Sequence, residues 1–525
     1  MAPYLQILFG MVSLMACYSV FKALIFNMHM FQLNGYRFST HISWLKKNAG
    51  RYAVEYIIFA LSFTGLIKYE PLFAFAAAAL LISLIAQAVE NRNRPQKKPL
   101  VYTPRVKRMF VTTGIIIALL YGFSCYLLST ETKNLAFLVI GLTASLSPLI
   151  ILLSNAVNKP VELSVNRYYL NDAKRMLKMM PELQTIGITG SYGKTSVKFY
   201  LYTILRAWTD TLVTPSSFNT PMGITITIRK SLKAVHKIFL CEMGAKWVGD
   251  IKELCDIVHP KHGIITALGE QHLESFGSKE NIIKTKYELA DALPADGRLY
   301  VNFDNEVIRK NLPSRPYISY GTTPDCDYYA SDIKISSSGT AFKINAPDGE
   351  SYDFDTKLLG NHNVINITGA VAAANGFGMP MSEMRRYVRR IEAVPHRMQI
   401  VPRGPVTIID DAFNSNPAGC RAALSALSQM EGMRILVTPG MVELGNEEYR
   451  LNREFGEFAA ECCDKIVLIG EKQTLAIKEG IESKLFNKED LFVFEKFTDA
   501  MEMLYNMKTD KKKIILLEND LPDNY

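Results

Sequence analysis

A glycine-rich loop at residues 189–196 has the residue types that bind nucleotide phosphates. Its glycines let successive backbone N–H groups turn toward an anion, while Lys194 can neutralise β- and γ-phosphate oxygens and Thr195 can ligate Mg²⁺. Ile188 stands where the common phosphate-loop pattern has its first glycine. The predicted nucleotide-binding residues of the loop are Thr189, Gly190, Ser191, Tyr192, Gly193, Lys194, Thr195 and Ser196.

The flanking sequence supplies the elements that must position such a loop. Thr185–Ile188 is predicted to be a short buried strand, and Ser196–Trp208 has the apolar spacing of a helix. A strand, a glycine loop and a helix in this order place the loop at a helix amino terminus, whose partial positive charge favours phosphate. A glycine turn beside a solvated lysine is the alternative interpretation.

A series of short motifs follows the loop in the sequence. They are F-N-T-P-M-G at 218–223, C-E-M-G-A at 241–245, Q-H-L-E-S-F-G-S at 271–278, N-F-D-N at 302–305, G-N-H-N-V-I-N at 360–366, P-H-R at 395–397 and D-D-A-F-N-S-N-P at 410–417. In this order they resemble the Mur ligase family, most closely the branch that adds D-alanyl-D-alanine to a muramyl tripeptide. The resemblance covers about residues 158–470 and is more specific than the loop alone.

The resemblance implies a site that holds ATP with two Mg²⁺ ions. Glu242 would bind one ion with Thr195, His272 would bind the second, and Lys286 would help to hold the second ion if its amine is carbamylated. The catalytic residues would then be Lys194, His272 and Lys286. Without the resemblance, Glu242 is an ordinary strand-end carboxylate, His272 a loop or core histidine, and Lys286 a surface lysine.

The resemblance also implies residues around the rest of the nucleotide. They are Asn302, Asn363, Arg397, Asp411 and Asn414. Asp411 would bind the ribose, an expected task for a carboxylate at a strand end, and Arg397 is a candidate for the phosphates. Phe413 stands where the family has a tyrosine, so any hydrogen bond from that hydroxyl is lost.

The first 157 residues are predicted to be a membrane domain. Apolar stretches cover 4–26, 53–67, 72–88, 110–128 and 135–153, and a bilayer core needs about 20 apolar residues per helix. They predict about five spans, or four if the two short stretches in the middle form one unit. A cleaved signal peptide is the alternative for the first stretch, but Met1–Gln6 has no basic residue.

Basic loop residues predict the orientation of these spans. They are Arg37, Lys46, Lys47 and Arg51 after the first stretch, and Arg92, Arg94, Lys97, Lys98, Arg105, Lys107 and Arg108 after the third. Positively charged loops stay in the cytoplasm, so five spans put the amino terminus outside a bacterial plasma membrane and the ligase domains inside. This topology explains much of the net charge of +8 and leaves no need for a nucleic-acid partner.

The sequence therefore predicts an α/β enzyme in three parts. Residues 1–157 form a transmembrane helical domain, 158–394 a central phosphate-loop domain of Mur type, and 395–525 a Rossmann-like carboxy-terminal domain. The eight cysteines are scattered without a Cys-x-x-Cys pair, which favours reduced thiols over a zinc site. The expected activity is an ATP-dependent, ADP-forming acid–amino-acid ligase that works through an acyl phosphate.

Two departures from the family leave the acceptor open. Members that use a nucleotide-linked muramyl peptide have a soluble amino-terminal domain for the uridine diphosphate, whereas membrane helices stand in that place here. After the strand-like Ile514–Leu517 the sequence reads E-N-D-L-P-D-N-Y, in place of the Lys-Gly-Ser-Arg-like segment of the D-alanyl-D-alanine branch.

The substrates can therefore be described only by class. The expected ones are a small amine, an amino acid or D-alanyl-D-alanine, and a muramyl-peptide carboxylate on a lipid or nucleotide carrier. The alternatives are the same chemistry on another acceptor, such as a poly-γ-glutamate chain, or a non-catalytic nucleotide-binding membrane scaffold. Loss of a metal-site residue would favour the scaffold, and Lys194, Glu242 and His272 are all present.

Overall fold

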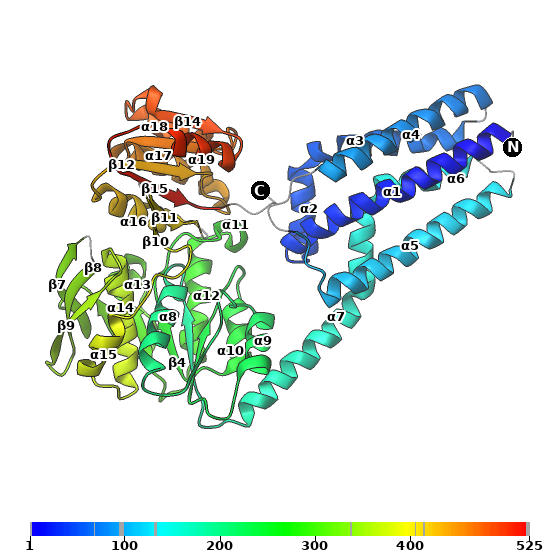
Figure 1. The fold of residues 1–525 in the computed structure, drawn as a ribbon. Helices are drawn as coiled ribbons and strands as arrows, with labels where there is room; N and C mark the ends of the chain where they lie inside the picture. The colour runs from blue at the N-terminus through cyan, green and yellow to red at the C-terminus, as the bar shows by residue number, and fades with distance from the viewer. Residues whose placement is uncertain are drawn as a thin grey trace. The chain divides into compact units, whose positions relative to one another are not determined.

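The computed structural model describes residues 3–67, 69–93, 99–130, 134–336, 339–404, 406–412 and 415–520. Two compact units form the chain: a helical unit that ends at Arg167 and an α/β unit from Tyr168 to Asp520 (Figure 1). The predicted α/β fold is confirmed for the second unit.

All the secondary-structure elements described in the amino-terminal unit are helices. Its elements are α1 (Pro3–Leu33), α2 (Phe38–Lys47), η1 (Ala49–Tyr52), α3 (Ala53–Ser62), η2 (Phe63–Leu66), α4 (Glu70–Asn93), α5 (Pro104–Leu128), α6 (Leu135–Ser145) and the start of α7 (Ser147–Lys178). α1 packs against α4, and α6 packs against α3 and α5. Val12, Leu80 and Phe137 are fully buried at these contacts, so the unit has an apolar core of its own.

Three described helices are long and apolar enough to cross a bilayer: Ile7–Leu33, Pro71–Asn91 and Pro104–Leu128. The prediction of five spans is not supported, because α3 ends after 10 residues and a bilayer core needs about 20. A fourth span exists only if α6 and α7, which meet at 76°, are counted as one. The orientation deduced from five spans therefore stays a prediction, and Arg94, Lys97 and Lys98 lie outside the described residues.

Pro148 explains the break between α6 and α7. Proline has no N–H to donate to the carbonyl four residues earlier, and its ring clashes with that carbonyl. The carbonyl of Ala144 instead accepts a hydrogen bond from Gln87 Nε2 at 3.4 Å. α7 then continues without interruption to Lys178, past Pro160. The predicted boundary at residue 157 thus falls inside a helix.

The central sheet of the second unit has nine strands in the order β2-β3-β1-β4-β5-β6-β7-β8-β9. Its strands are β1 (Gln184–Thr189), β2 (Thr211–Val213), β3 (Ile238–Glu242), β4 (His262–Ile265), β5 (Leu299–Asn302), β6 (Ile318–Gly321), β7 (Tyr328–Ser336), β8 (Gly339–Asn345) and β9 (Ser351–Thr356). The first seven in this order run parallel, whereas β7, β8 and β9 pair antiparallel.

Helices cover both faces of the parallel strands. They are α8 (Lys194–Leu205), α9 (Pro221–Ser231), α10 (Asp250–Val258), α11 (Leu273–Phe276), α12 (Lys279–Ala292), α13 (Glu306–Lys310), α14 (Asn361–Gly376) and α15 (Met381–Val388). On β3, Leu240 belongs to the core with α8 and α14, and Phe239 to the core with α9, α10 and α12. Because these strands are parallel, their carboxyl ends and the motifs that follow them meet at one edge.

A second sheet of six strands, in the order β10-β11-β15-β12-β13-β14, forms the carboxy-terminal domain. Its elements are β10 (Gln399–Arg403), β11 (Val406–Asp411), α16 (Pro417–Ser428), β12 (Met433–Thr438), η3 (Gly445–Glu447), α17 (Glu448–Cys462), β13 (Lys465–Ile469), α18 (Leu475–Ser483), η4 (Lys488–Asp490), β14 (Leu491–Phe494), α19 (Phe497–Asn506) and β15 (Lys513–Glu518). Only β10 is antiparallel to its neighbour. β15 lies between β11 and β12, so the last strand of the chain lies in the interior of this sheet.

Candidate active site

The glycine loop joins β1 to α8, as the sequence predicts. Gly190 has a φ of 149°, and a Cβ there would lie 2.2 Å from Thr266 Oγ1, so only glycine fits. The loop is also tied to the segment after β4, because Ser191 N donates to Ala267 O at 2.6 Å and Ser191 Oγ donates to Gly269 O at 3.0 Å. These contacts hold the loop in one shape before any ligand binds.

Lys194 folds back over this loop. Its Nζ donates to Gly190 O at 2.7 Å and to Ser191 O at 2.9 Å. Burial lowers the pKa of Lys194 to about 8, although Glu242 nearby acts to raise it. The ammonium group thus lies among neutral carbonyl oxygens, which phosphate oxygens could replace with a gain in charge complementarity.

Glu242, at the end of β3, carries a buried charge that several groups stabilise. Thr195 Oγ1 and Asn219 Nδ2 both donate to Oε1 at 3.1 Å, and Lys198 Nζ lies 2.9 Å from Oε2. The Lys198 and Glu242 side chains are 0% and 1% exposed. Burial opposes ionisation of Glu242, but Lys198 and Lys194 outweigh it and hold the pKa of the carboxyl below its usual range.

Thr195 and Glu242 fit a magnesium ion that also binds ATP. Mg²⁺ prefers oxygen ligands and is commonly held by one or two carboxylates together with substrate phosphates. A hydroxyl and a carboxylate oxygen 3.1 Å apart at the phosphate loop are donors of this kind. Groups of three or more His, Cys, Asp or Glu that could hold a metal are absent among the described residues, so phosphate oxygens or water would complete the coordination.

His272 lies just before α11 and pairs through Nδ1 with the Glu443 carboxylate. Lys246 Nζ contacts the other oxygen of that carboxylate at 2.7 Å. Burial lowers the pKa of His272, and Glu443 acts against this. Because Glu443 follows β12, these contacts join the carboxy-terminal domain to the central domain beside the predicted second metal ligand.

Lys286, in α12, is 2% exposed, so the surface-lysine interpretation is wrong. Burial lowers the pKa of Lys286 well below its usual range, and Lys194 lowers it further. Its Nζ lies 5.9 Å from the centre of the Phe276 ring. The neutral amine is favoured in these surroundings, and only a neutral amine adds to carbon dioxide to form a carbamate.

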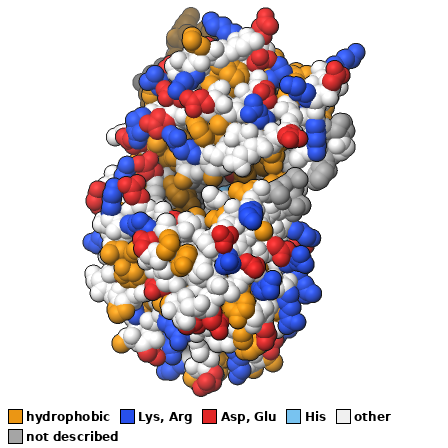
Figure 2. Space-filling model, turned by 90° about the vertical axis from the view of Figure 1, so that its left-hand side faces the viewer, with side chains coloured by type: hydrophobic (Ala, Val, Ile, Leu, Met, Phe, Trp, Pro, Cys, Tyr) orange, Lys and Arg blue, Asp and Glu red, His pale blue; other side chains and the backbone are white. Residues whose placement is uncertain are grey.

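A pocket of 690 Å³ opens beside the loop, with walls from both sheet domains. The space-filling view shows the surface hollowed between the two lobes (Figure 2). Seven of the residues predicted to bind the nucleotide line this pocket: Tyr192, Gly193, Ser196, Asn302, Asn363, Arg397 and Asp411. Lys194, Thr195, Glu242, His272 and Lys286 do not line it. The pocket falls within the size range of small-molecule and cofactor sites.

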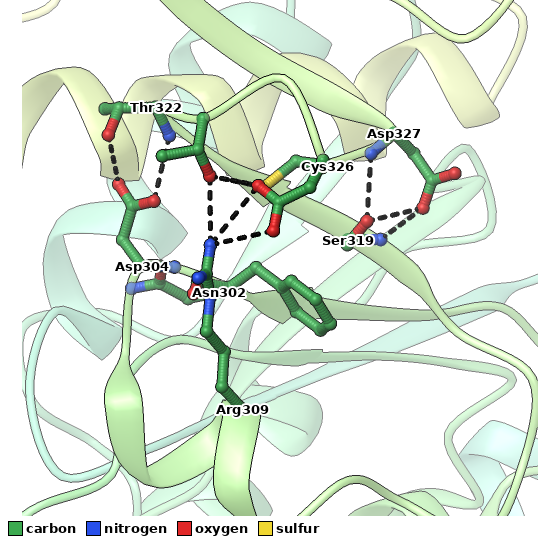
Figure 3. Close-up of polar contacts among 10 residues, drawn as sticks. Asn302, Asp304, Arg309, Ser319, Thr322, Cys326 and Asp327 are labelled. Carbon is green, nitrogen blue, oxygen red and sulfur yellow. Dashed lines mark hydrogen bonds and ion pairs between the residues drawn. The ribbon is translucent and has the colours of Figure 1, made fainter.

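Asn302 is held in the wall of this pocket by its own turn. Its Oδ1 accepts a hydrogen bond from Asp304 N at 3.0 Å, and the Asp304 carboxylate accepts from Thr322 N and Oγ1 at 3.0 and 2.8 Å (Figure 3). Asn305, also in the wall, donates to Leu268 O at 3.0 Å and accepts from Leu268 N at 3.2 Å. The turn is therefore fixed to β6 on one side and to the segment after β4 on the other.

Asn363 lies in the first turn of α14, across the pocket wall. Its Oδ1 accepts a hydrogen bond from Tyr200 OH at 2.7 Å, and its Nδ2 donates to Leu359 O at 2.8 Å. Asn366, one turn further on, approaches Gly193 so closely that a Cβ on the glycine would lie 2.9 Å from Asn366 Oδ1. α14 is therefore packed directly onto the phosphate loop.

The segment between the two sheet domains places Arg397 and Asp411 in the pocket. His396 and Met398, on either side of Arg397, have φ values of 59° and 48°, which non-glycine residues adopt only at a cost. Met398 N donates to Asp411 Oδ1 at 3.0 Å and so fixes the segment to β11. Burial raises the pKa of Asp411, against the pull of Arg397. Phe413 and Asn414 lie outside the described residues.

Comparisons with known proteins agree with this arrangement. Residues 188–374 match the Mur ligase middle domain and residues 396–518 match the Mur ligase glutamate ligase domain. The chain belongs to the Mur ligase family. Mur ligases are ATP-dependent, ADP-forming amide ligases, so the predicted enzyme class is confirmed.

Individual relatives are similar over the same region. The UDP-N-acetylmuramoyl-tripeptide--D-alanyl-D-alanine ligase of Bacillus subtilis is 29% identical over 334 residues, which cover 63% of this Mur ligase and 71% of the relative. The Escherichia coli enzyme of that name is 28% identical over 334 residues, covering 61% and 73%. The crystal structure of MurF from Acinetobacter baumannii superposes with a TM-score of 0.62 at 26% identity, over 68% of this chain and 77% of that one.

Three residues of this Mur ligase were not predicted to belong to the site. Lys198 lies four residues after Lys194 and so on the same face of α8, a spacing that could have indicated it. Glu443 reaches His272 only through the contact between domains, which leaves no local signal. Glu518 ends β15 opposite Asp411, lines the pocket and accepts a hydrogen bond from Ser415 Oγ at 2.6 Å.

Replacing Lys198 with methionine should destabilise the folded chain by about 3–5 kcal/mol, because the Glu242 charge would stay buried without its partner. The double variant Lys198→Met/Glu242→Gln should recover much of this loss, since it removes both charges. Urea denaturation of the full chain in detergent measures the difference. Lys310→Met, which breaks the exposed pair with Glu306, is the control and should cost under about 1 kcal/mol. A double variant no more stable than Lys198→Met would contradict the role assigned to the pair.

Proposed function

We propose that this Mur ligase is a membrane-anchored enzyme of peptidoglycan precursor synthesis. It joins an amine, an amino acid or D-alanyl-D-alanine, to the carboxylate of a muramyl peptide, on the cytoplasmic side of a bacterial plasma membrane. The observation that carries the proposal is the set of charged and polar groups at the phosphate loop, where Lys194, Thr195 and Glu242 lie together. The names of the relatives support the muramyl-peptide acceptor.

The chemistry begins with activation of the acceptor carboxylate. A carboxylate oxygen attacks the γ-phosphorus of ATP, the bond from that phosphorus to the bridging oxygen breaks, and ADP leaves. The amine then attacks the carbonyl carbon of the acyl phosphate, and phosphate leaves with one former carboxylate oxygen. The product is an amide, and the amine loses a proton in the second step.

Each proposed residue has a defined task in these steps. Lys194 exchanges its contacts with loop carbonyls for β- and γ-phosphate oxygens and neutralises charge as the γ-phosphoryl group is transferred. Magnesium, held by Thr195 and Glu242, would supply further positive charge at those oxygens. Lys198 contacts Oε2 of Glu242 and so keeps this carboxylate ionised and oriented. Water must be excluded from the acyl phosphate, so closure of the carboxy-terminal domain about residues 394–398 is part of the proposal.

Lys286 and His272 are proposed to serve a second magnesium ion. The buried neutral amine of Lys286 supports carbamylation, which would turn a cation into an oxygen ligand with negative charge. His272 already has a carboxylate partner in Glu443, so its ring orientation is fixed. Around the nucleotide, Asp411 is proposed to bind the ribose and Arg397 the phosphates. Asn302 and Asn363 are proposed to bind other polar groups of the nucleotide, and Asn414 is a further candidate for this task.

The acceptor is proposed to be linked to a lipid rather than to uridine diphosphate. Three apolar helices long enough to span a bilayer stand before the ligase domains, and the match to the Mur ligase family begins only at residue 188. A substrate confined to the membrane would reach a membrane-anchored enzyme by lateral diffusion. The retained set Lys194, Thr195 and Glu242 argues against a non-catalytic scaffold.

Lys194→Ala should reduce phosphate release by about 100-fold or more, because the main cation at the transferred phosphoryl group is removed. Release of inorganic phosphate from ATP, in the presence of acceptor and amine, measures this. Lys310→Ala on the exposed helix α13 is the matched control and should keep full turnover. Full activity of Lys194→Ala would contradict the assignment of the loop.

Asp411→Asn should weaken ATP binding by about tenfold, since a charged hydrogen-bond acceptor for the ribose is lost. Burial raises the pKa of Asp411, so the ionised acceptor is present at neutral pH and is lost as the pH falls through that raised pKa. The advantage of the unaltered protein over Asp411→Asn should therefore shrink on acidification, beginning at a higher pH than for an exposed aspartate. Calorimetric titrations with ATP from pH 7.5 down to about 5 test this. Asp355→Asn, on β9, is the control, and equal ATP affinity of Asp411→Asn and unaltered protein would refute the ribose assignment.

Amine-dependent phosphate release should be faster with a polyprenyl-linked muramyl peptide than with its uridine diphosphate-linked counterpart at equal concentration. The assay uses the full chain in lipid nanodiscs, with Lys194→Ala as the background control. Turnover only with the nucleotide-linked peptide would overturn the lipid-linked acceptor while leaving the ligase chemistry intact.

A further inference from the structure

Glu518, the last residue of β15, carries a buried carboxyl group in the wall of the pocket beside the phosphate loop. The residue is 1% exposed. Ser415 Oγ and Cys420 Sγ donate hydrogen bonds to its Oε1 at 2.6 and 3.2 Å. Oε2 is enclosed as well, yet it has no hydrogen-bond partner among the described residues. The steps proposed for the ligase reaction give this group no task.

The strand register places Glu518 next to Asp411, the residue proposed to bind the ribose. β11 and β15 are parallel neighbours (Figure 1), and Asp411 pairs with Glu518 across them. Side chains paired in this way project from the same face of a sheet. Ile409 and Leu516, two residues earlier on each strand, are buried in one core with Cys420 of α16. Both carboxyl groups therefore project from the face that α16 covers, and both residues line the pocket.

Two neighbouring carboxyl groups resist ionising together, because each negative charge disfavours the other. Arg397 favours the charge of Asp411, whereas neither oxygen of Glu518 contacts a lysine, arginine or histidine in the part of the chain that the structure describes. Burial raises the pKa of Glu518 well above its usual range, and the charge of Asp411 raises it further. Burial raises the pKa of Asp411 to about 6. At neutral pH the pair therefore holds one proton, and Glu518 carries it.

The hydrogen bonds of Glu518 decide which of its oxygens carries the proton. Oε1 already accepts from Ser415 and Cys420, so a proton on this oxygen would face two donors. A protonated carboxyl group donates one hydrogen bond from its O–H, which leaves Oε2 as the donor atom. The Asp411 carboxylate, opposite in register, is the charged acceptor on this face. Hydrogen bonds from an O–H group to a carboxylate are among the stronger ones in proteins.

We propose that Glu518 is a positioning residue of the nucleotide site, which as a neutral carboxylic acid donates from Oε2 to Asp411 and orients that carboxylate toward the ribose of ATP. The proposal rests on the ribose role proposed above for Asp411. An ionised carboxylate has about four acceptor positions. Met398 N occupies one of them, on Oδ1, and Glu518 occupies a second, which leaves two for the ribose hydroxyls. Asp411 is thus held by the connecting segment and by the last strand.

Binding that depends on the ribose hydroxyls separates this role from a purely structural one. The full chain in detergent is titrated calorimetrically with ATP and with 2′,3′-dideoxy-ATP, which has the same base and phosphates but lacks both hydroxyls. Glu518→Met should weaken ATP binding about tenfold, because Asp411 loses the hydrogen bond that orients it. The affinity for dideoxy-ATP should not change. Glu495→Met, the same substitution at an exposed residue of the same domain, is the matched control and should alter neither affinity.

Glu518→Gln tests whether the group acts in its protonated form. The amide N–H can donate where the carboxylic acid donates, and the amide oxygen can accept from Ser415, so ATP affinity should stay within about threefold of that of the unaltered protein. A glutamine variant as weak as Glu518→Met would contradict a neutral donor. Infrared spectra at neutral pH should show the C=O stretch of a carboxylic acid that is missing in Glu518→Gln, and identical spectra would also contradict the proposal.

Failure of this proposal and failure of the ribose assignment give different results. In the Asp411→Asn background, Glu518→Met should weaken ATP binding no further, because the residue acts through Asp411. Equal loss of ATP and dideoxy-ATP affinity in Glu518→Met would indicate a structural effect and overturn the proposal. Selective loss of ATP binding in Asp411→Asn, without any loss in Glu518→Met, would overturn it and leave the ribose assignment in place. Unchanged ATP affinity of Asp411→Asn would contradict both.

Discussion

A negative charge buried at the end of β3 organises the catalytic edge of the central sheet. Glu242 is almost fully enclosed, and a carboxylate can stay ionised there only with cations and hydrogen-bond donors around it. Lys198, Thr195 and Asn219 supply these from α8 and from the segment before α9. The register of β3 with β1 then puts the charge beside the phosphate loop. The positions of Thr195, Lys198 and the proposed magnesium are thus all tied to this one buried charge.

The contact between the two sheet domains depends on the same edge. His272 and Lys246 from the central domain both reach Glu443 in the carboxy-terminal domain, and Asp411 receives a hydrogen bond from the strained connecting segment. The nucleotide pocket is therefore built from two lobes held by a small number of polar contacts. Such contacts can be exchanged for contacts with a ligand, which is compatible with a carboxy-terminal domain that closes on ATP.

Local features of the site could be predicted from the sequence, whereas features created by packing could not. The strand, the loop around Gly190 and the helix that follows are encoded within a few neighbouring residues, so their pattern was sufficient. The spacing from Lys194 indicates the face of α8 on which Lys198 lies, but its pairing with Glu242, 44 residues away, arises only from packing. Lys286 alone indicates a surface residue because its burial is decided by the packing of α12 on the sheet. Five spans are not supported because counting apolar residues does not detect the short α3 or the break that Pro148 introduces, whereas the four-span alternative equals the count obtained if α6 and α7 are one span.

Transfer of oxygen from the acceptor to phosphate tests the central claim most directly, since the account requires an acyl phosphate. The acceptor carboxylate is labelled with ¹⁸O, and the inorganic phosphate released with ATP and amine is examined by mass spectrometry. The account predicts one ¹⁸O atom in each phosphate formed by amide synthesis. Amide synthesis that releases only unlabelled phosphate would contradict it.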